Sequence, residues 1–600
     1  MNQQTSTALP ADFTRVFDIL EFQEKKYPQP KAAVAFREGE WKNFSIQELR
    51  RRANRVASWL IVHGIQKGDR IAIVPRMGSP EWLIVDFGCQ LVGAVVVPIH
   101  PTSSLSEVEF ILTETEAKGC ITADTELFER IHQLSTSVRP SFVYHLESSK
   151  EGTFPPCRTD DTSTTHPELL MRSAAVTGDD LLAIMYTSGT TGTPKGAMLT
   201  HGNVVNSTKS ILTIFPLQPG ERVLSFLPFS HIFERASCYG YLAFGVSIYF
   251  SQSLDQLKHD FISARPHFFT CVPRTLEKMY DFLEEQRESK NFVKRTVIRW
   301  AMEVGSQYKD IHTGWSYAIK LFFARVLVLN YWRRALGGKV RYLGVGAAAL
   351  RPEIARLFAA AGIVPLAGYG MTEASPFIST NRSLPGLNRL GTVGIPVPGV
   401  EIRIDEPNDQ GEGEIQVRGP NIMPGYYKRP DLTAEVFTPD RWLRTGDVGK
   451  MVGKRFLAIT DRKKDIFKTS TGKYVAPQAV QNHLAASPFI SQSLVLGFNQ
   501  PYVIAILVPH FQLLNSWCEE HEIHWTSPKY MVHNIKVIQK FQEEIDRLNE
   551  GLQGHERVKK FILSDEEWTV ENHDLTTSFK PMRGNLMDKH KAQIEKLYSS

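Results

Sequence analysis

The residues best suited to chemistry lie at positions 186–196, where the chain reads Tyr-Thr-Ser-Gly-Thr-Thr-Gly-Thr-Pro-Lys-Gly. The apolar run from Leu181 to Met185 predicts a buried strand before this segment, and a helix is expected from about Thr200. Free backbone amides, hydroxyls and a lysine in such a loop can bind phosphate oxygens. The predicted phosphate-binding residues are Thr187, Ser188, Gly189, Thr190, Thr191, Gly192 and Lys195.

This loop is not a Walker A motif, because Pro194 stands where that pattern requires its second glycine and Gly196 replaces its serine or threonine. A flexible surface loop is the alternative, since Gly, Ser and Thr cluster in such loops. The order of residues nevertheless resembles the signature loop of the adenylate-forming enzymes, which include acyl-CoA synthetases, peptide-synthetase adenylation domains and firefly luciferase. The resemblance spans nearly the whole chain and implies a catalytic role for Thr190.

A second signature of this family resembles residues 367–373, Ala-Gly-Tyr-Gly-Met-Thr-Glu. The resemblance implies that Tyr369 stacks on adenine, that Gly370 allows close approach to a flat ring, and that Thr372 binds the α-phosphate. Glu373 is expected to act in catalysis and to hold Mg²⁺, a hard cation that prefers carboxylate and phosphate oxygens. A Gly-Tyr-Gly turn alone would be structural, but two signatures in the family's order favour a nucleotide site.

The segment Thr445-Gly446-Asp447 resembles the ribose-binding motif of the family. The carboxylate of Asp447 can accept the protons of both ribose hydroxyls, as acidic residues do in dinucleotide folds. The charged run that begins with Asp461 and Arg462 follows at the expected distance. The resemblance implies that Arg462 also contacts ribose and that Asp461 is the hinge between two domains, residues 1–461 and 462–600.

Two motifs near the C-terminus resemble segments that act in successive half-reactions of the family. Residues 468–477 resemble the loop that moves over the thiol acceptor in acyl-CoA synthetases, which places Gly472 and Lys473 on the CoA side. Thr577-Ser578-Phe579-Lys580 resembles the C-terminal motif T-x-S-G-K and makes Lys580 the expected catalytic lysine. Phe579 replaces the usual glycine, as larger residues commonly do in long-chain fatty acyl-CoA synthetases.

Two further segments bear on the acyl group. Residues 227–235 resemble the L-P-x-x-H-x-x-E-R run of the long-chain branch, which borders the fatty-acid tunnel. His231 is therefore a candidate for the acyl side, although a core histidine explains it equally well. Residues 345–350 stand where the family often reads S-G-G-A-x-L. Gly346 and Ala347 are expected beside the nucleotide, while Val345 and Ala347 depart from the family's pattern.

The elements that position these residues alternate between strand-like and helical segments in residues 10–140. Residues 46–61 have helical periodicity, whereas 71–74 and 91–99 read as strands. Ser104 and Glu107 form a capping box that opens a helix. This alternation predicts a layered α/β domain with mostly parallel sheets.

The sequence pattern changes after about residue 385. Short β-rich stretches between Gly and Pro turns predict a small distorted barrel there. From residue 462 a mixed segment with long charged helices follows. The predicted fold class is α/β. It combines a large N-terminal domain of layered α/β subdomains and a small distorted β-barrel with a small mobile α+β C-terminal domain, an arrangement that the family resemblance also implies.

The composition, 42% hydrophobic and 22% charged residues, is that of an ordinary globular protein. A net charge of +5 is mild for 600 residues and argues against a nucleic-acid partner. Six scattered cysteines favour neither a zinc site nor a disulfide framework. No leader and no membrane-spanning apolar run is evident, so a cytoplasmic location is expected. A homodimer is left open.

Residues 291–341 hold ten Lys or Arg residues against only Glu303 and Asp310. Within them, residues 320–332 are apolar on nearly every side except for Arg325. A buried helix with solvated basic ends is the simpler interpretation. The alternative is a peripheral contact with the inner face of the membrane, where basic residues meet anionic lipid.

Taken together, the motifs predict an ATP-dependent long-chain fatty acid–CoA ligase that uses ATP, Mg²⁺ and CoA and acts on small-molecule substrates. Two alternatives share the fold: an acyl-AMP ligase that loads a carrier protein, and a CoA ligase for aryl or medium-chain acids. A non-catalytic acyl- or nucleotide-binding scaffold is the alternative from another class. It would be expected to have lost Thr190, Glu373, Asp447 or Lys580, and all four are present.

Overall fold

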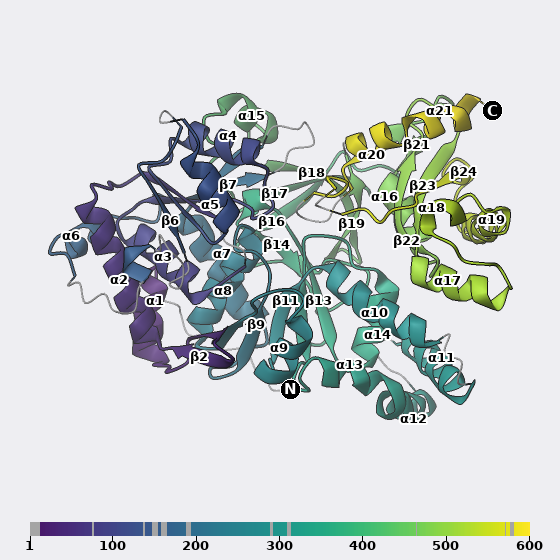
Figure 1. The fold of residues 1–600 in the computed structure, drawn as a ribbon, viewed down its shortest axis with the longest axis horizontal. Coiled ribbons are helices and arrows are strands. Elements are labelled where there is room, and N and C mark those ends of the chain that lie inside the picture. The colour runs from purple at the N-terminus through teal and green to yellow at the C-terminus, as the bar shows by residue number, and fades with distance from the viewer. Residues whose placement is uncertain are drawn as a thin grey trace.

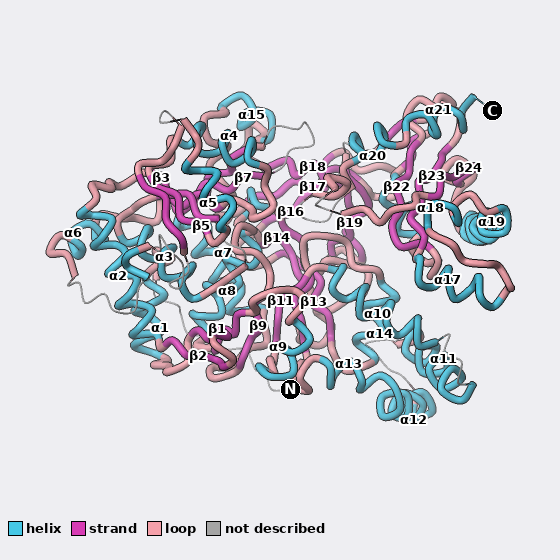
Figure 2. The backbone as a smooth tube through the Cα atoms, in the orientation of Figure 1, coloured by secondary structure: helices cyan, strands magenta, loops and turns pink. Residues whose placement is uncertain are grey.

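The computed structural model describes the chain from residue 13 to residue 599, apart from several short internal segments. The described residues are 13–74, 77–135, 138–146, 154–157, 165–187, 194–287, 292–308, 314–463, 465–569, 572–576 and 581–599. Side chains of residues 281–287 are not included in the description. Helices surround the strands, and the chain runs from the purple N-terminal layers to the yellow C-terminal unit (Figures 1 and 2).

The first sheet has six strands and carries the predicted phosphate loop between its last two. Neighbouring strands are parallel except for the antiparallel final pair. Its strand order is β6 (Phe142–His145), β5 (Gly119–Thr122), β3 (Arg70–Val74), β4 (Val95–Pro98), β7 (Leu181–Thr187) and β8 (Lys195–Thr200).

The second sheet has nine strands, and its six central strands are parallel. Its order is β15 (Ile395–Pro396), β14 (Phe377–Thr380), β13 (Val364–Gly370), β12 (Tyr342–Val345), β11 (Phe268–Cys271), β9 (Arg222–Ser225), β10 (Ser247–Phe250), β1 (Ala33–Arg37) and β2 (Glu40–Phe44). The predicted layered α/β fold with mostly parallel sheets is confirmed.

Helices cover both sheets. They are α1 (Asp18–Lys26), α2 (Ile46–Val62), α3 (Pro80–Leu91), α4 (Leu105–Thr115), α5 (Thr125–His132), α6 (Leu169–Ala174), α7 (His201–Ile214), α8 (Ile232–Phe244), α9 (Leu257–Ala264), α10 (Pro273–Arg287), α11 (Phe292–Ser306), α12 (Trp315–Ala324), α13 (Asn330–Ala335), α14 (Pro352–Ala360) and α15 (Pro430–Val436). Short turns of other helix types are η1 (Pro155–Cys157), η2 (Arg325–Leu329) and η3 (Thr372–Ala374).

Local sequence signals explain several of these boundaries. Ser104 and Glu107 exchange the two hydrogen bonds of the expected capping box, and the helix begins at Leu105. The strand expected at residues 91–99 is shorter than predicted. Helix α3 continues through Leu91, and β4 occupies only Val95–Pro98, because an apolar run does not by itself separate a buried helix end from a strand.

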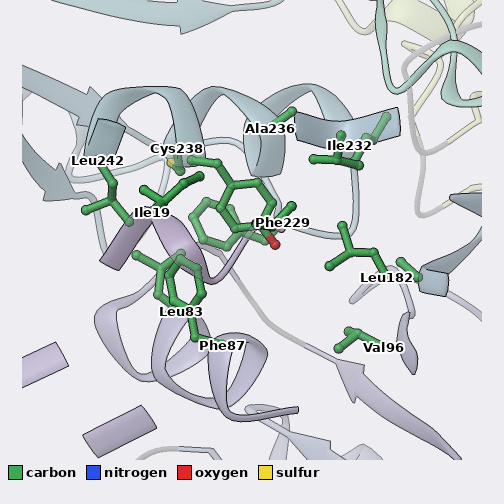
Figure 3. Packing of buried hydrophobic residues seen from close by; sticks show 14 of the residues in the cluster. Ile19, Leu83, Phe87, Val96, Leu182, Phe229, Ile232, Ala236, Cys238 and Leu242 are labelled. Carbon is green, nitrogen blue, oxygen red and sulfur yellow. The ribbon is translucent and has the colours of Figure 1, made fainter. Parts of the chain in front are cut away.

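Helix α8 lies at the centre of the main hydrophobic core. Its residues Ile232, Ala236 and Leu242 belong to one hydrophobic cluster with Ile19 of α1 and Leu83 of α3 (Figure 3). All five side chains are nearly inaccessible to solvent. Burial of an aliphatic side chain of this size contributes about 1.5–3 kcal/mol. Because α8 begins directly after His231, this packing fixes the place of a predicted acyl-side residue.

The segment expected to form a small distorted barrel is a four-stranded antiparallel sheet. Its strands follow one another in chain order: β16 (Glu401–Asp405), β17 (Gly413–Arg418), β18 (Leu443–Val452) and β19 (Phe456–Arg462). The register shifts in two of the three ladders, which bends the sheet. Backbone hydrogen bonds from Val393 to Leu457 and from Leu457 to Gly394 tie its last strand to the main body.

The C-terminal unit has a small hairpin and a mixed three-stranded sheet packed against helices. The strands are β20 (Phe467–Lys468), β21 (Tyr474–Val475), β22 (Ile490–Leu496), β23 (Val503–Pro509) and β24 (Val558–Leu563). The helices are α16 (Pro477–Leu484), α17 (Phe511–Glu520), α18 (Pro528–Met531), α19 (Ile535–Asn549), α20 (Arg583–Lys589) and α21 (Lys591–Ser599).

The hydrophobic cores divide near residue 461. Three clusters contain buried residues up to Leu457, and two others contain only residues from Phe467 onward. In Figure 1 the C-terminal unit accordingly forms a separate body at the upper right. The boundary between residues 461 and 462 lies within this interval and stays a prediction.

The interpretation of residues 320–332 as a buried helix is wrong. The segment comprises the end of α12, the π-helical turn η2 and the start of α13, and only one of its faces is buried. Phe322, Phe323 and Leu327 are 61%, 51% and 60% exposed. No helix among the described residues is long and apolar enough to cross a lipid bilayer.

Candidate active site

The predicted phosphate loop joins two antiparallel strands, not a strand and a helix as expected. Thr187 at the end of β7 pairs with Lys195 at the start of β8, and α7 begins only after β8. The N-terminus of α7 therefore does not follow the loop directly, and phosphate binding would depend on backbone amides, hydroxyls and Lys195. The predicted residues Ser188, Gly189, Thr190, Thr191 and Gly192 lie outside the described residues.

Strand β8 brings a distant segment of the chain against the loop. Met198 donates a backbone hydrogen bond to Gly425, and Tyr427 donates one to Gly196. These bonds place Tyr426 beside Lys195, whose Nζ lies 5.8 Å from the centre of the tyrosine ring. This distance is within the range of a cation–π interaction.

Glu373 is held in the same cluster. It lies in the turn η3 that follows β13, and only 8% of its surface is exposed. The hydroxyl of Tyr426 donates a 2.7 Å hydrogen bond to its Oε1. Burial and the adjacent carboxylate raise the pKa of Tyr426, so that the phenol keeps its proton and remains a donor. Lys195, Tyr426 and Glu373 thus form a continuous polar array, with the predicted Thr372 next to it.

A second carboxylate lies where three strands meet. Tyr369 of β13 donates a 2.6 Å hydrogen bond to Oδ2 of Asp447 on β18. Arg462 is the register partner of Asp447 on β19, and its Nε lies 3.4 Å from Oδ1. Burial raises the pKa of Tyr369 well above its usual value. The carboxylate is therefore oriented by a neutral donor and a cation, and the predicted residues Tyr369, Asp447 and Arg462 are brought together.

Gly370 is required for a reason that the sequence did not indicate. A Cβ atom at this position would lie 2.0 Å from the carbonyl oxygen of Pro376. The close contact is with the protein's own backbone, at the turn where β13 reverses into β14. This reversal positions η3, which carries Thr372 and Glu373.

The predicted residues Gly346 and Ala347 lie at the carboxyl end of β12. A Cβ atom on Gly346 would lie 3.2 Å from the ring of Phe233, so β12 and α8 are in close contact here. Ala347 has a φ of 70°, in the region that favours glycine. Alanine, which stands here in place of the family's glycine, therefore adopts a strained backbone conformation.

His231 lies at the N-cap of α8 without capping the helix through its side chain. Its ring centre is 5.1 Å from that of His100, which follows β4. Burial and the neighbouring imidazole lower the pKa of His100 to about 3, so His100 is neutral at physiological pH. Among the described residues, its Nε2 has no hydrogen-bond partner.

Sequence reasoning missed both His100 and Tyr426. A histidine at the carboxyl end of a strand in a parallel sheet is a usable signal for His100, because ligands bind at that edge. No local signal identifies Tyr426, since it reaches Glu373 across 53 residues of sequence.

The Glu-Arg pair that follows His231 belongs to the core. Glu234 accepts 2.6 Å hydrogen bonds from Ser225 and Thr270, and burial raises its pKa to about 7. Arg235 is fully buried and pairs with Asp86. These contacts fix α8 against β9, β11 and α3, so the two residues position His231 without reaching the site.

Among the described residues, no hydrogen bond joins the predicted hairpin residues Gly472 and Lys473 to either carboxylate. Gly472 and Lys473 are exposed in the hairpin between β20 and β21, which is bonded within itself and to the turn at Gln500. Asp461 is 2% exposed and accepts backbone hydrogen bonds from Arg462 and Gln478. The predicted catalytic Lys580 lies outside the described residues.

The described residues contain no cluster of three or more His, Cys, Asp or Glu side chains suited to a metal ion. Mg²⁺ needs no such cluster, because it is usually held by one or two carboxylates together with substrate phosphates and water. Glu373 fits this requirement. Tyr426 engages one of its carboxylate oxygens, Oε1, and fixes the orientation of the group beside the phosphate loop.

Comparison with known proteins decides the family. The model of the AMP-binding enzyme family matches residues 20–427, and that of the AMP-binding enzyme C-terminal domain matches residues 464–600. The chain belongs to the AMP-binding enzyme family. Together the two models cover this AMP-binding enzyme on both sides of the predicted hinge.

Curated relatives of this AMP-binding enzyme cover almost its full length. It is 30% identical over 575 residues to long-chain-fatty-acid–CoA ligase FadD15 of Mycobacterium bovis, which covers 94% of this chain and 93% of that protein. It is 32% identical over 596 residues to human long-chain-fatty-acid–CoA ligase 6, covering 92% of this chain and 82% of that protein.

Solved structures show the same fold at lower identity. The adenylation domain of a carboxylate reductase from Mycobacterium chelonae superposes with a TM-score of 0.74 at 23% identity, covering 99% of this chain and 92% of that one. ATP-bound MatB from Rhodopseudomonas palustris superposes with a TM-score of 0.71 at 23% identity, covering 96% and 99%. The predicted fold of a large N-terminal and a small C-terminal domain agrees with these structures.

Proposed function

We propose that this AMP-binding enzyme activates a long-chain fatty acid with ATP to an acyl-adenylate and transfers the acyl group to CoA. The products are acyl-CoA, AMP and pyrophosphate. The proposal rests on one observation. The fold brings four segments that are far apart in the sequence together, and their side chains orient two carboxylates. Glu373 is fixed by Tyr426 next to Lys195, and Asp447 is fixed by Tyr369 and Arg462.

Each carboxylate has a distinct proposed role. Asp447 is oriented by donors on both of its oxygens, as a group that must accept from two ribose hydroxyls requires. Glu373 is the proposed magnesium ligand, and bound Mg²⁺ would supply charge neutralisation on the phosphates. Thr190, the residues next to it in the loop, and Thr372 are proposed to bind the phosphates.

The first half-reaction joins two anions. A carboxylate oxygen of the fatty acid attacks the α-phosphorus of ATP, a new P–O bond forms, and the bond to the leaving pyrophosphate breaks. Lys195 and Lys580 are proposed to neutralise the charge on the phosphate oxygens. Holding the two reactants in line reduces the barrier by up to about 7–11 kcal/mol.

The second half-reaction takes place at the acyl carbonyl carbon instead of at phosphorus. The thiolate of CoA attacks the acyl carbonyl, a C–S bond forms, and AMP leaves with the electron pair of the broken C–O bond. We assign the hairpin that carries Gly472 and Lys473 to this step. Rotation about Asp461 would exchange Lys580 for this hairpin at the site.

His231 and the neighbouring His100 are assigned to the acyl side of the site. The names of the curated relatives and the match of residues 227–235 to the long-chain pattern support a long acyl substrate. We place the reaction in the cytoplasm, in agreement with the scattered cysteines and the mild net charge.

The test is AMP release by the full chain with a ladder of saturated fatty acids, with and without CoA. Turnover should require CoA and favour acyl chains of roughly 12–18 carbons, because each buried CH₂ contributes about 0.8 kcal/mol. A preference for acetate, benzoate or cinnamate would contradict the long-chain assignment. Rapid adenylate formation that CoA never discharges would identify a carrier-protein ligase, and no AMP under any condition would identify a binding scaffold.

A further inference from the structure

An apolar face extends along α12, η2 and α13 on the outside of the molecule. It consists of large side chains that recur every three or four residues and therefore share one side of the helical segment. Between 45% and 81% of each residue's surface is exposed. This apolar face comprises Trp315, Ile319, Phe322, Phe323, Val326, Leu327 and Tyr331.

The opposite side of the same segment is anchored to the protein. Trp332 stacks on Phe358 of α14 with ring centres 4.4 Å apart, and its Nε1 donates to the carbonyl oxygen of Met279. Leu321 and Ala324 are buried in the same cluster. Because this inner side is packed, the segment cannot rotate to bury its apolar face. Figure 1 places α12 and α11 at the margin, away from the sheets.

Exposed basic residues lie on the same helical segment, on the adjacent α11 and just after α13. Within residues 292–308 and 314–341 the structure describes nine Lys or Arg residues and one acidic residue, Glu303. Two more large apolar residues, Phe292 and Val293, are each 69% exposed at the start of the adjacent α11. The basic residues exposed there are Lys294, Arg299, Lys320, Arg334 and Arg341.

We propose that this surface docks on a bilayer that contains anionic phospholipid, with the apolar face inserted at the level of the headgroups. An interfacial helix typically combines Trp, Phe and Leu on one side with Lys and Arg beside it. Three aromatic residue types, Trp315, Phe322 and Tyr331, lie on this face. The segment from 315 to 331 spans roughly 25 Å at 1.5 Å per residue, which suits a helix lying flat on the membrane.

A second copy of the chain fits this face less well than a bilayer. A symmetric dimer would place the same patch against itself, and the basic residues of the two copies would face one another. Glu303 is the only acidic residue described in the two segments and cannot balance them. Anionic headgroups supply the opposite charge directly.

Docking would bring the enzyme to the phase in which a long-chain fatty acid dissolves. This consequence depends on the proposed function, whereas the docking itself does not. The inner side of the same helical layer packs in one cluster with Val345 of β12, which directly precedes Gly346. The docked helices and the strand that leads to the predicted nucleotide residue Gly346 therefore belong to one hydrophobic cluster.

The test is flotation of the full chain with vesicles, in the absence of substrates, so that it does not depend on catalysis. Vesicles of phosphatidylcholine alone are compared with vesicles that also contain phosphatidylglycerol, at low and high salt. The double variant Phe322→Ser/Phe323→Ser removes half-exposed apolar surface without touching the buried side. Leu170→Ser/Met171→Ser is the matched control, because these residues are 82% and 66% exposed on the distant α6.

The wild type and the control should float with the anionic vesicles at low salt, and high salt should weaken binding, since the attraction is screened. The double variant should bind about tenfold less while keeping its circular dichroism spectrum. The proposal is overturned if the wild type does not bind anionic vesicles at low salt, or if the double variant binds equally well. The proposal is also overturned if sedimentation without lipid shows that the wild type and the control variant are dimers and the double variant is a monomer.

Discussion

At the scale of single residues, the site depends on tyrosines that orient carboxylates. Tyr369 and Tyr426 are both held as neutral phenols, and each donates to a carboxylate that the sequence assigns to nucleotide or metal binding. A buried carboxylate with a fixed donor loses little additional freedom when a ligand binds. The orientation is therefore built into the free protein.

Asp447→Ala should weaken ATP binding at least tenfold. The substitution removes the acceptor assigned to the ribose hydroxyls, and each hydrogen bond to a charged group contributes about 1.5–3 kcal/mol. Titration calorimetry with ATP measures the effect. Asp409→Ala is the control, because Asp409 is exposed in a loop of the same antiparallel sheet. Equal ATP affinity for Asp447→Ala and wild type would remove Asp447 from the nucleotide site.

At the scale of elements, the packing of α8 sets the acyl side of the site. Glu234 on α8 accepts hydrogen bonds from Ser225 on β9 and Thr270 on β11, inside the core. Burial raises its pKa in the folded protein to about 7, above the value of a solvated carboxyl. The ionised form is therefore costly in the native state, although the two hydroxyls offset part of this cost.

This pKa shift gives a pH dependence of defined sign. Because the folded pKa is the higher one, the stability that Glu234 contributes is present at acid pH and lost as the pH rises through about 7. The Glu234→Gln variant has no carboxyl at this position to ionise. The melting temperature of the variant minus that of the wild type should therefore increase from pH 5 to pH 8. Scanning calorimetry at both values tests this, and other titrating groups cancel in the difference. A gap that stays constant with pH would contradict it.

Elements with local signals could be predicted from sequence, and elements set by distant contacts could not. The capping box at Ser104 and the apolar run of β7 determine their own structure. Strand β8 was missed because Lys-Gly-Ala-Met-Leu-Thr has no clear period, and it forms by pairing with β7 and with residues 425–427. The same pairing brings Tyr426 to Glu373, so Glu373 was predictable from the sequence but its partner Tyr426 was not.

The exposed face of α12 shows a second limit of prediction from sequence, which concerns burial. Sequence composition correctly identified residues 320–332 as apolar, but an apolar segment can be buried or exposed. Which faces are covered depends on α14, whose Phe358 packs on Trp332 and leaves the other side open.

At the scale of the whole molecule, the hydrophobic clusters form two groups, one with buried residues up to Leu457 and one with buried residues from Phe467 onward. The described polar contacts between these two parts of the chain include Arg351 with the carbonyl oxygen of Ala485 and Asp461 with the amide of Gln478. Burial raises the pKa of Asp461 to about 6, and the half-buried Arg583 at the start of α20 offsets part of this shift. A carboxylate buried at the junction is a group that a change of domain arrangement would expose.

The half-reactions of three variants test the central claim, that the chain is an AMP-forming ligase whose two steps use different parts of the C-terminal unit. Lys580→Ala should lower fatty-acid-dependent pyrophosphate exchange about 10²–10³-fold, as loss of one electrostatic donor does, and leave thioester formation from acyl-adenylate and CoA nearly intact. Gly472→Val should show the reverse, because Gly472 has a φ of 83° in the hairpin assigned to CoA. Lys591→Ala, an exposed lysine in α21, should retain both steps. Equal loss of both half-reactions in the two folded variants, or unchanged exchange in Lys580→Ala, would contradict the account.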